Sequence, residues 1–463
     1  MPGITKMSKT SRKQRQLILL LGDVIIFYLA LFGALAIRNF DIPTTVVLFK
    51  HVVPFSFAFI GWVAVYYTAG LYSLEIIFDV GKIFSRLGVS VIFSTLATAA
   101  MFYVLQVSSV SPKLVLILFS IFTGVLSAFW RLAYTRLTGS RKLRMGVAFV
   151  GSNRAVVELL NDSRDLAGMG YVARLVLDET YASAASIAGV PVSSERADLA
   201  KAVVSNEVQV VVFGNEAALP AETRRLLFTL LESHPHYMSL VEFYELVFRR
   251  LPIGEIDETW ILENSNLAGK GGYLAAKRAI DIVVGLAIAL LSFPLWPFIA
   301  LGIAIESRGP IIFSQTRLGK RSLPFTIYKF RTMFVENKGL AADFPGDSRI
   351  TRIGGFLRAT RLDELPQMYN LIRGDMSFVG PRPERPELAA RLEGEIPCYR
   401  QRLLVKPGLT GWDQVSGEYH SPSIEDTYKK LRFDLYYIKN LSLSLDVSVF
   451  FKTILTVLLR TGQ

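Results

Sequence analysis

The sequence predicts a membrane protein in three parts: an α-helical membrane bundle, an α/β domain, and a second α/β module that begins with a membrane helix. The chain has 463 residues, of which 51% are hydrophobic and only 19% charged, and this balance is too apolar for a soluble protein of this length. Four long apolar segments come first, short β-rich runs alternate with helical runs next, and a fifth apolar segment follows them.

Four segments of about 20 residues are predicted to be membrane spans, because a helix of that length crosses a bilayer. They run from about Leu17 to Ile37, Val52 to Tyr72, Leu87 to Val107 and Leu114 to Tyr134. Basic residues flank both ends of this bundle: Lys6, Lys9, Arg12, Lys13 and Arg15 before it, and Arg136, Arg141, Lys142 and Arg144 after it. The positive-inside rule therefore predicts that both ends face the cytoplasm. We expect no cleaved signal peptide, because no small-residue cleavage site follows the first span.

The net charge of +12, from 51 Lys and Arg against 39 Asp and Glu, indicates anionic partners. Nucleic acid is not expected, because the basic residues flank apolar segments and are not interleaved with aromatic residues on a soluble face. Anionic lipid headgroups and phosphorylated substrates fit this distribution better. The single cysteine, Cys398, excludes a disulfide within the chain.

From about residue 143 to 266, β-rich runs alternate with helical runs and predict a small α/β domain. The predicted strands are Val147 to Val150, Val172 to Leu177 and Val208 to Phe213, and the predicted helices are Ala155 to Leu160, Ala197 to Val204 and Ala221 to Leu231. Gly151-Ser152-Asn153 follows the first strand as a nucleotide-binding turn would, and Asp178 ends the second strand where a ribose-binding acid lies. Because the further glycines of that motif are missing, a scaffold or regulatory domain is the favoured interpretation and nucleotide binding the alternative.

The segment from Ile280 to Ile305 is apolar apart from Asp281 and is long enough to cross a membrane. Basic residues flank it on both sides, Lys277 and Arg278 before it and Arg308, Arg317, Lys320 and Arg321 after it, so both ends are expected in the cytoplasm. Pro294 lies near the middle, where proline breaks a helix, and Ser292 is placed to bond a freed carbonyl. We expect a re-entrant helix that bends at Pro294; a kinked ordinary span is the alternative.

The run Thr360-Arg361-Leu362-Asp363-Glu364-Leu365-Pro366-Gln367 places two carboxylates side by side. Because Asp363 and Glu364 repel each other when ionised, a fold that keeps both charges needs a metal ion or a nearby cation. Thr360 with Asp363 is also a capping-box pattern at a helix start, and these eight residues alone favour that structural interpretation. The surrounding chain shifts the balance towards a metal and phosphate site.

Cations near the acidic pair predict phosphate binding. In Gly380-Pro381-Arg382-Pro383 the two prolines limit the movement of Arg382, which suits bidentate capture of a phosphate. In the β-like run from Phe325 to Arg331, strand alternation places Lys329 and Arg331 on one face, and two adjacent cations suit a diphosphate. Each of these two cations taken singly is also consistent with a solvated surface charge.

From about Lys277 to the C-terminus the chain resembles the bacterial sugar transferases, the monotopic phosphoglycosyl transferases that start lipid-linked glycan assembly. The matching runs are Lys277-Arg278 with Asp281, the Pro294 break, Ser307-Arg308-Gly309-Pro310, Tyr328-Lys329-Phe330-Arg331-Thr332-Met333, Arg361-Leu362-Asp363-Glu364-Leu365-Pro366-Gln367, Arg373-Gly374-Asp375-Met376-Ser377-Phe378-Val379-Gly380-Pro381-Arg382-Pro383-Glu384 and Lys406-Pro407-Gly408-Leu409-Thr410-Gly411-Trp412. Their number and order make the resemblance specific. One departure is Phe293, where many members of the family have serine directly before the proline.

The whole chain is similar to the large subclass of this family. That resemblance implies a four-helix transmembrane domain at residues 1–142 and a Rossmann-like cytoplasmic domain at 143–266. It implies an α/β monotopic catalytic module at 267–463, with the re-entrant membrane helix at about 280–305. The implied location is the bacterial cytoplasmic (inner) membrane, with several spans and the catalytic module facing the cytoplasm.

The resemblance implies an enzyme that transfers a sugar-1-phosphate from a UDP-sugar to a polyprenyl phosphate such as undecaprenyl phosphate and releases UMP. This reaction starts the assembly of exopolysaccharide, capsule or O-antigen (lipopolysaccharide) repeat units. Asp363 would be the nucleophile that forms an aspartyl phosphosugar, and Glu364 would hold Mg²⁺. The implied substrate-binding residues are Lys329, Arg331, Arg361, Arg382, Thr410 and Gly411.

Two other functions are weighed against this one. A membrane-anchored nucleotide-sugar dehydratase also joins four spans to a Rossmann domain, and Tyr273 and Lys277 have the spacing of its catalytic pair. This pair, however, lies at the start of a membrane segment, and the glycine-rich cofactor loop is missing. A lipid flippase conflicts with the long charged C-terminal module. The motifs do not identify the sugar, and the family resemblance favours a homodimer.

Overall fold

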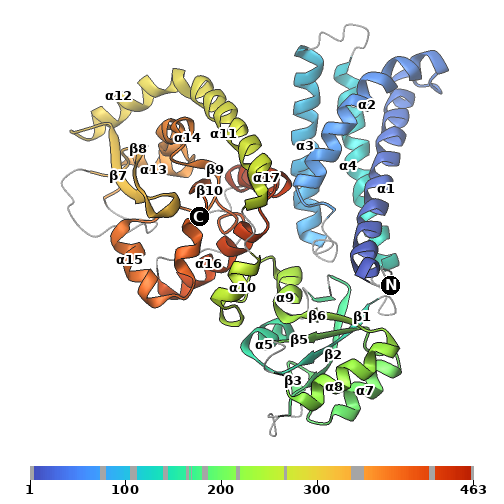
Figure 1. Ribbon diagram of the computed structural model, residues 1–463. Helices are drawn as coiled ribbons and strands as arrows, with labels where there is room; N and C mark the ends of the chain where they lie inside the picture. The colour runs from blue at the N-terminus through green and yellow to red at the C-terminus, as the bar shows by residue number, and fades with distance from the viewer. Residues whose placement is uncertain are drawn as a thin grey trace. The chain divides into compact units, whose positions relative to one another are not determined.

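The computed structural model describes residues 5–72, 80–104, 112–138, 144–162, 166–167, 169–179, 186–214, 219–264, 268–334, 349–416 and 423–459. The chain divides into two compact units, Met1–Phe248 and Arg249–Gln463 (Figure 1). The predicted domain boundaries at 142/143 and 266/267 lie outside the described residues, as do Arg141 and Lys142 of the predicted basic flank.

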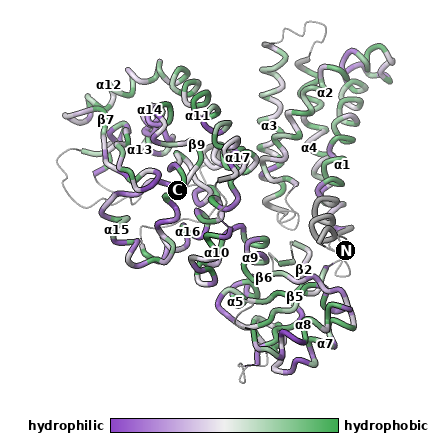
Figure 2. The backbone as a smooth tube through the Cα atoms, in the orientation of Figure 1, coloured by the Kyte–Doolittle hydropathy of each residue, from purple (hydrophilic) through white to green (hydrophobic). Residues whose placement is uncertain are grey.

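Four long helices coincide with the four predicted membrane spans over most of their length. They are α1 (Thr5–Asn39), α2 (Thr45–Thr68), α3 (Val80–Val104) and α4 (Pro112–Thr138) (Figure 1). Residues 105–107 of the third predicted span lie outside the described residues. Each helix contains a stretch long and apolar enough to cross a membrane, and a fifth such stretch lies in the second unit. Figure 2 shows the apolar character along these helices.

Aromatic rings fill the centre of the four-helix bundle. The ring centroids of Phe27 and Trp62 are 5.7 Å apart, and those of Trp62 and Phe119 are 5.0 Å apart. The bundle also buries an ion pair, in which Arg131 Nη1 and Nη2 donate to Asp23 Oδ1 and Oδ2 over 2.9 and 2.8 Å. Because an unpaired charge is costly in an apolar bundle, this pair links α1 to α4 at a fixed register.

The predicted α/β domain is confirmed and holds one mixed sheet. Its strands are β1 (Met145–Val150), β2 (Tyr171–Leu177), β3 (Ser186–Ile187), β4 (Val190–Ser193), β5 (Val210–Phe213) and β6 (His236–Ser239). The strand order is β3-β4-β2-β1-β5-β6, and all neighbours are parallel except β3 and β4. The predicted strands are β1, β2 and β5 in its middle, where buried apolar runs give the clearest signal.

Helices cover both faces of this sheet (Figure 1). The helices α5 (Arg154–Asn161) and α9 (Leu240–Phe248) pack on one face, and α7 (Arg196–Val204), α8 (Ala221–Thr229) and the short η3 (Leu230–Ser233) pack on the other. Helix α9 follows β6 directly and buries Phe243 and Tyr244 completely, although the sequence analysis did not predict it.

The turn after β1 has the backbone that a glycine permits, because Gly151 has φ of +96°. Asn153 caps α5 by accepting a hydrogen bond from the main chain of Val156 over 3.0 Å. Asp178 at the end of β2 accepts hydrogen bonds from the main chain and the hydroxyl of Ser152. The turn and the acid are therefore bonded to each other.

The second unit places helices around two small sheets. Its first part contains η4 (Ile253–Glu255), α10 (Glu258–Asn264), η5 (Ala268–Lys270), α11 (Gly271–Ser292), η6 (Phe293–Leu295), α12 (Trp296–Glu306), β7 (Ile312–Leu318), η7 (Lys320–Ser322) and β8 (Pro324–Phe330). Its second part contains α13 (Arg352–Ala359), η8 (Leu362–Gln367), α14 (Met368–Arg373), β9 (Ser377–Val379), α15 (Pro386–Glu395), η9 (Tyr399–Leu404), β10 (Gly408–Thr410), α16 (Ile424–Lys439) and α17 (Leu443–Leu459). Strands β7 and β8 are antiparallel, and β9 and β10 are parallel.

The fifth apolar stretch, Gly271–Glu306, is interrupted where Pro294 lies. The α-helix gives way to the 3₁₀ turn η6 there, and α11 and α12 run in different directions (Figure 1). Ser292 Oγ donates to the Ala289 carbonyl and accepts from the Trp296 indole, each over 3.3 Å, so it bonds polar groups at the break. The large apolar side chains around it are exposed: Leu290, Leu291, Phe293 and Phe298.

Candidate active site

Asp363 and Glu364 lie in η8, which follows α13 through a left-handed residue, Arg361, with φ of +59°. Thr360 ends α13 by donating its hydroxyl to the carbonyls of Phe356 and Leu357. No side chain caps the start of η8. The capping-box interpretation is therefore wrong, and the two carboxylates are left for another role.

Glu364 is held by cations. Lys329 Nζ on β8 lies 2.9 Å from Glu364 Oε1, and Arg361 Nη1 lies 4.0 Å from the same oxygen. Burial opposes ionisation of this carboxyl, but the charges of Lys329 and Arg382 outweigh it and lower the pKa of Glu364 to about 2. Glu364 is therefore ionised throughout the physiological pH range.

Asp363 has the opposite environment. Its side chain is buried, with 7% exposed, and makes no hydrogen bond to another described residue. Burial and the neighbouring Glu364 charge raise the pKa of Asp363, although Lys329 and two arginines partly offset them. Two adjacent carboxyls whose pKa values move apart are typical of a site with two chemical roles. A carboxylate that nothing else holds is suited to react with a ligand.

Arg382 lies in the loop after β9, and its charge helps to lower the pKa of Glu364. Main-chain hydrogen bonds fix this loop: Gly380 N donates to Thr410 O, and Gly408 N donates to Pro381 O, both over 2.9 Å. The structure therefore places Lys329 and Arg361 beside Glu364, and the charge of Arg382 acts on the same carboxyl. Three cations beside two carboxylates form a site that can receive a phosphate group.

Arg331 lies elsewhere, although it alternates with Lys329 on the same strand. Its guanidinium is buried and donates to the main-chain oxygens of Ser307 and Arg308, just after the end of α12. Strand β8 ends at Phe330, although the Arg331 main chain still donates to the Ile311 carbonyl over 2.9 Å. The structure gives Arg331 a part in joining α12 to β8.

Thr410 and Gly411 lie against the Arg382 loop. The Thr410 hydroxyl is 2.8 Å from the Thr453 hydroxyl of α17. A Cβ atom on Gly411 would lie 2.9 Å from the Gly380 carbonyl and closer still to the Asp413 carboxylate. Only glycine fits at position 411, so the close approach of the two loops depends on it.

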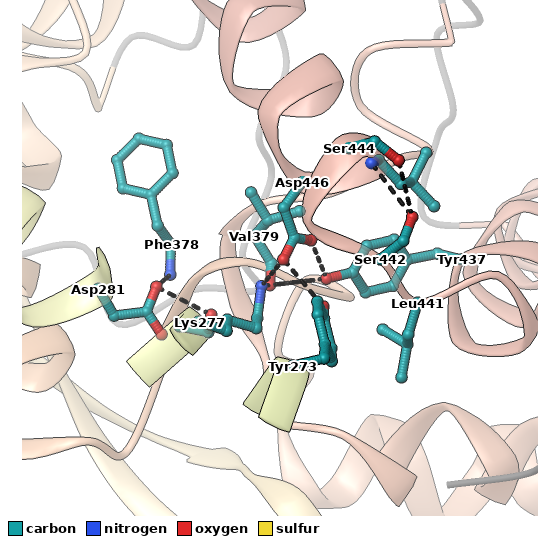
Figure 3. Close-up of polar contacts among 12 residues, drawn as sticks. Tyr273, Lys277, Asp281, Phe378, Val379, Tyr437, Leu441, Ser442, Ser444 and Asp446 are labelled. Atoms are coloured by element: carbon teal, nitrogen blue, oxygen red, sulfur yellow. Dashed lines mark hydrogen bonds and ion pairs between the residues drawn. The ribbon is translucent and has the colours of Figure 1, made fainter. Parts of the chain in front are cut away.

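A buried polar cluster that the sequence analysis did not predict holds α11 in place. Asp446 on α17 accepts hydrogen bonds from Tyr273 and Lys277, both over 2.8 Å, and from Tyr437 over 2.6 Å (Figure 3). Asp281 accepts from the main chain of Phe378 over 2.8 Å. In the sequence, Lys277 is a flanking basic residue, a residue matching the family and part of a dehydratase-like pair with Tyr273, but no local pattern pairs Lys277 with a residue of α17.

Arg278, between these two residues, donates to the carbonyls of Leu371 and Ile372 at the end of α14. Glu306 at the end of α12 accepts from the main chains of Arg352 and Ile353. Both ends of the broken apolar stretch are thus bonded to the same compact unit that carries the acidic pair.

The acidic pair offers carboxylate oxygens, which are the ligands that a divalent metal ion such as Mg²⁺ prefers. Among the described residues, no group of three or more His, Cys, Asp or Glu side chains could enclose a metal ion. Mg²⁺ does not need such a group, because it is commonly held by one or two carboxylates together with substrate phosphates and water. Asp363 and Glu364 are suited to hold Mg²⁺ in this way, together with substrate phosphates and water.

An apolar stretch that is long enough to cross a membrane, is broken at Pro294 and is joined to a site of carboxylates and cations is typical of a class of membrane-associated proteins. The chain belongs to the bacterial sugar transferase family, whose model matches residues 272–460. The matched residues begin at the first turn of α11 and include every residue of the site described above.

Three relatives illustrate the match. A UDP-N-acetylgalactosamine-undecaprenyl-phosphate N-acetylgalactosaminephosphotransferase of Aeromonas hydrophila is 39% identical over 246 residues, which cover 53% of this chain and 57% of that protein. A UDP-glucose:undecaprenyl-phosphate glucose-1-phosphate transferase of Escherichia coli K12 is 41% identical over 181 residues, which cover 38% of this chain and 39% of that protein. Exopolysaccharide production protein PSS of Rhizobium leguminosarum bv. phaseoli is 40% identical over 195 residues, which cover 40% of this chain and 97% of that protein. The chain thus spans little more than half the length of the first relative and less than half of the second.

Proposed function

We propose that this protein transfers a sugar-1-phosphate from a UDP-sugar to undecaprenyl phosphate, releases UMP, and so begins the assembly of a bacterial surface polysaccharide. The observation that carries the proposal is the acidic pair, in which Asp363 makes no hydrogen bond among the described residues while Glu364 is held by Lys329. The activities for which the Aeromonas and Escherichia coli relatives are named support it.

The proposed chemistry has two displacements at one phosphorus. An Asp363 carboxylate oxygen attacks the sugar-bearing phosphorus of the UDP-sugar, the bond to the bridging oxygen breaks, and UMP leaves with that electron pair. An oxygen of undecaprenyl phosphate then attacks the same phosphorus and expels the Asp363 carboxylate. A covalent route lets a soluble and a lipid substrate use one site in turn.

The surrounding cations have separate proposed roles. Lys329 and Arg361 hold Glu364, and Arg382 adds positive charge from the loop after β9, so these cations would offset the charge of the reacting phosphoryl group. Glu364, with oxygens of the substrate diphosphate, would hold Mg²⁺, which would offset the charge that develops on the phosphoryl oxygens. Arg331 keeps a structural role in this proposal.

The proposed location is the bacterial cytoplasmic membrane, with the site on the cytoplasmic side where UDP-sugars occur. The bonds that fix both ends of Gly271–Glu306 to one unit support a helix that enters and leaves the same leaflet. The exposed apolar residues around Pro294 would then lie in the lipid, and the acidic pair would lie near the depth of a lipid phosphate. Homodimer formation stays a prediction from the family resemblance.

The test is UMP release by the purified protein in detergent with Mg²⁺, undecaprenyl phosphate and each of several UDP-sugars, including UDP-glucose and UDP-N-acetylgalactosamine. Asp363→Asn should abolish turnover in a folded protein, because an amide cannot serve as the nucleophile. Retention of more than about a tenth of wild-type activity would contradict the assignment of Asp363. The dehydratase alternative is disfavoured, because Tyr273 and Lys277 both bond Asp446.

A further inference from the structure

A buried arginine lies behind the loop that carries Arg382. Arg402, in η9, has 4% of its side chain exposed, and its Nη2 donates to the main-chain oxygen of Arg382 over 3.0 Å. The same Nη2 lies 2.9 Å from Asp434 Oδ2, while Nη1 donates to the Tyr399 hydroxyl over 2.9 Å. Glu384 Oε1 lies 3.8 Å from Arg402 Nη1. One guanidinium therefore joins the Arg382 main chain to residues of η9 and α16.

Side chains from other elements also lie against the carbonyls of Pro383 and Val379 in this loop. Arg317 Nη1 donates to the Pro383 carbonyl over 3.2 Å, and the Tyr437 hydroxyl lies 3.2 Å from the Val379 carbonyl. Asp434 and Tyr437 lie one turn apart on α16, so a single helix supports the loop near both of its ends. These bonds hold the main chain from which the Arg382 side chain extends.

We propose that Arg402 is a positioning residue for the transfer reaction, which holds the Arg382 main chain so that the Arg382 guanidinium meets the diphosphate of the UDP-sugar. This inference rests on the proposed function. Arg402 itself is enclosed by Tyr399, Glu384, Asp434 and the Arg382 carbonyl, so its effect on the substrate passes through Arg382.

The chemistry of the position requires arginine. A guanidinium presents several N–H groups in a fixed plane, and Arg402 uses two of its nitrogens on a carbonyl, a carboxylate and a phenol oxygen. A lysine ammonium is a single point and cannot reach these acceptors together. Arg402→Lys should therefore keep the buried charge and lose the hold on the Arg382 carbonyl.

The test variant is the pair Arg402→Met/Asp434→Asn in the full-length protein, because removing both charges avoids a buried unpaired carboxylate. In the UMP-release assay we expect the KM for the UDP-sugar to rise about tenfold or more, since small misplacements of a substrate-holding group have large effects. The KM for undecaprenyl phosphate should stay within about twofold, because the loop is argued to hold the nucleotide sugar.

A double-mutant cycle then separates positioning from general damage. If Arg402 acts through Arg382, adding the Arg402→Met/Asp434→Asn pair to Arg382→Met should make the enzyme no worse than Arg382→Met alone. Losses that multiply would overturn the proposal, as would a folded pair variant with an unchanged KM for the UDP-sugar. The matched control is Arg391→Met, which removes an exposed arginine from an ion pair with Glu395 on α15 and should leave both KM values unchanged.

Arg402→Lys carries the test if the pair variant does not fold. It retains the charge and should show the same rise in the KM for the UDP-sugar, while wild-type kinetics in this variant would overturn the proposal. Failure of the proposed function is a separate outcome, because the wild-type protein would then release no UMP from any UDP-sugar.

Discussion

Asp363 and Glu364 are neighbours in sequence whose surroundings separate them. Burial and the Glu364 charge raise the pKa of Asp363, whereas Lys329 and Arg382 overcome burial and lower the pKa of Glu364 to about 2. Glu364 stays charged while Asp363 titrates, so the ionisation of Asp363 depends on which charges its neighbours carry. The dependence of activity on pH therefore reports on the arrangement of Asp363, Glu364 and Lys329.

If Asp363 is the nucleophile, the acid limb of the kcat/KM profile should follow the pKa of Asp363, because only the ionised carboxylate would attack. Lys329→Met removes a charge that lowers this pKa, so the limb should move to higher pH. Glu364→Gln removes a charge that raises this pKa, so the limb should move to lower pH. UMP release measured across pH tests this, and shifts of both variants in the same direction would contradict the assignment.

Sequence patterns predict the residues of the candidate site but not their supports. Asp363, Glu364, Lys329 and Arg382 are assigned to one site only through the motifs around them, because the acidic run and the strand cation each also have a structural interpretation when taken alone. Arg402 gives no such signal, because a buried arginine is recognised only by acceptors that lie far away in sequence. Its partner Asp434 is on a different helix, and no local periodicity relates the two.

At the scale of elements, the hydropathy of the sequence predicts where the membrane helices lie but not how their polar residues pair. Length and apolar composition predicted all five apolar stretches, because a bilayer sets both quantities. Hydropathy does not indicate which polar residue pairs with which. The Asp23–Arg131 pair in the bundle and the Lys277–Asp446 pair in the second unit both join distant segments, and only the folded structure reveals them.

Removing one partner of the Asp23–Arg131 ion pair should destabilise the protein more than replacing both partners. Arg131→Met leaves the Asp23 carboxylate buried without a partner and should destabilise the protein by about 3–5 kcal/mol. The double variant Asp23→Asn/Arg131→Met should recover most of that loss. Thermal unfolding in detergent, followed by circular dichroism, measures both, and equal losses in the single and double variants would contradict this account.

The break at Pro294 makes a prediction about topology. If Gly271–Glu306 is re-entrant, single cysteines placed at Gly272 and at Arg308 in a Cys398→Ser background should both be labelled only from the cytoplasmic side. Pro294→Ala restores the missing main-chain donor and should favour a straight helix. A straight helix could span the bilayer and carry the acidic pair away from the UDP-sugar of the proposed reaction. Activity should therefore fall although Pro294 lies outside the acidic pair and its cations. Labelling of the Arg308 position from outside in the unmodified helix would exclude the re-entrant arrangement.

At the scale of the whole molecule, the compact second unit begins at Arg249, before the first residue of the family match at 272. The segment Arg249–Asn264 is bonded within this unit: the Trp412 indole donates to the Arg249 carbonyl over 2.9 Å, and Leu251 N donates to Arg432 O over 3.0 Å. Trp412 directly follows Gly411, so this segment supports one of the loops of the candidate site. Sequence patterns could not reveal the segment, because its few buried apolar residues show no long periodicity.

Two fragments test whether the second unit works without the first. The fragment Arg249–Gln463 and a shorter one beginning at Leu267 should both release some UMP in detergent, because the acidic pair and its cations lie within either. The shorter fragment loses the buried side chains of Leu251, Ile253 and Ile256, each worth about 1.5–3 kcal/mol when fully buried, together with the bond to Trp412. It should therefore unfold at a lower temperature and have a higher KM for the UDP-sugar, as thermal scans and UMP-release kinetics would measure. Equal stability of the two fragments would contradict the role given to Arg249–Asn264.

Strict dependence of the full-length enzyme on added NAD would overturn the view that the α/β domain is a scaffold.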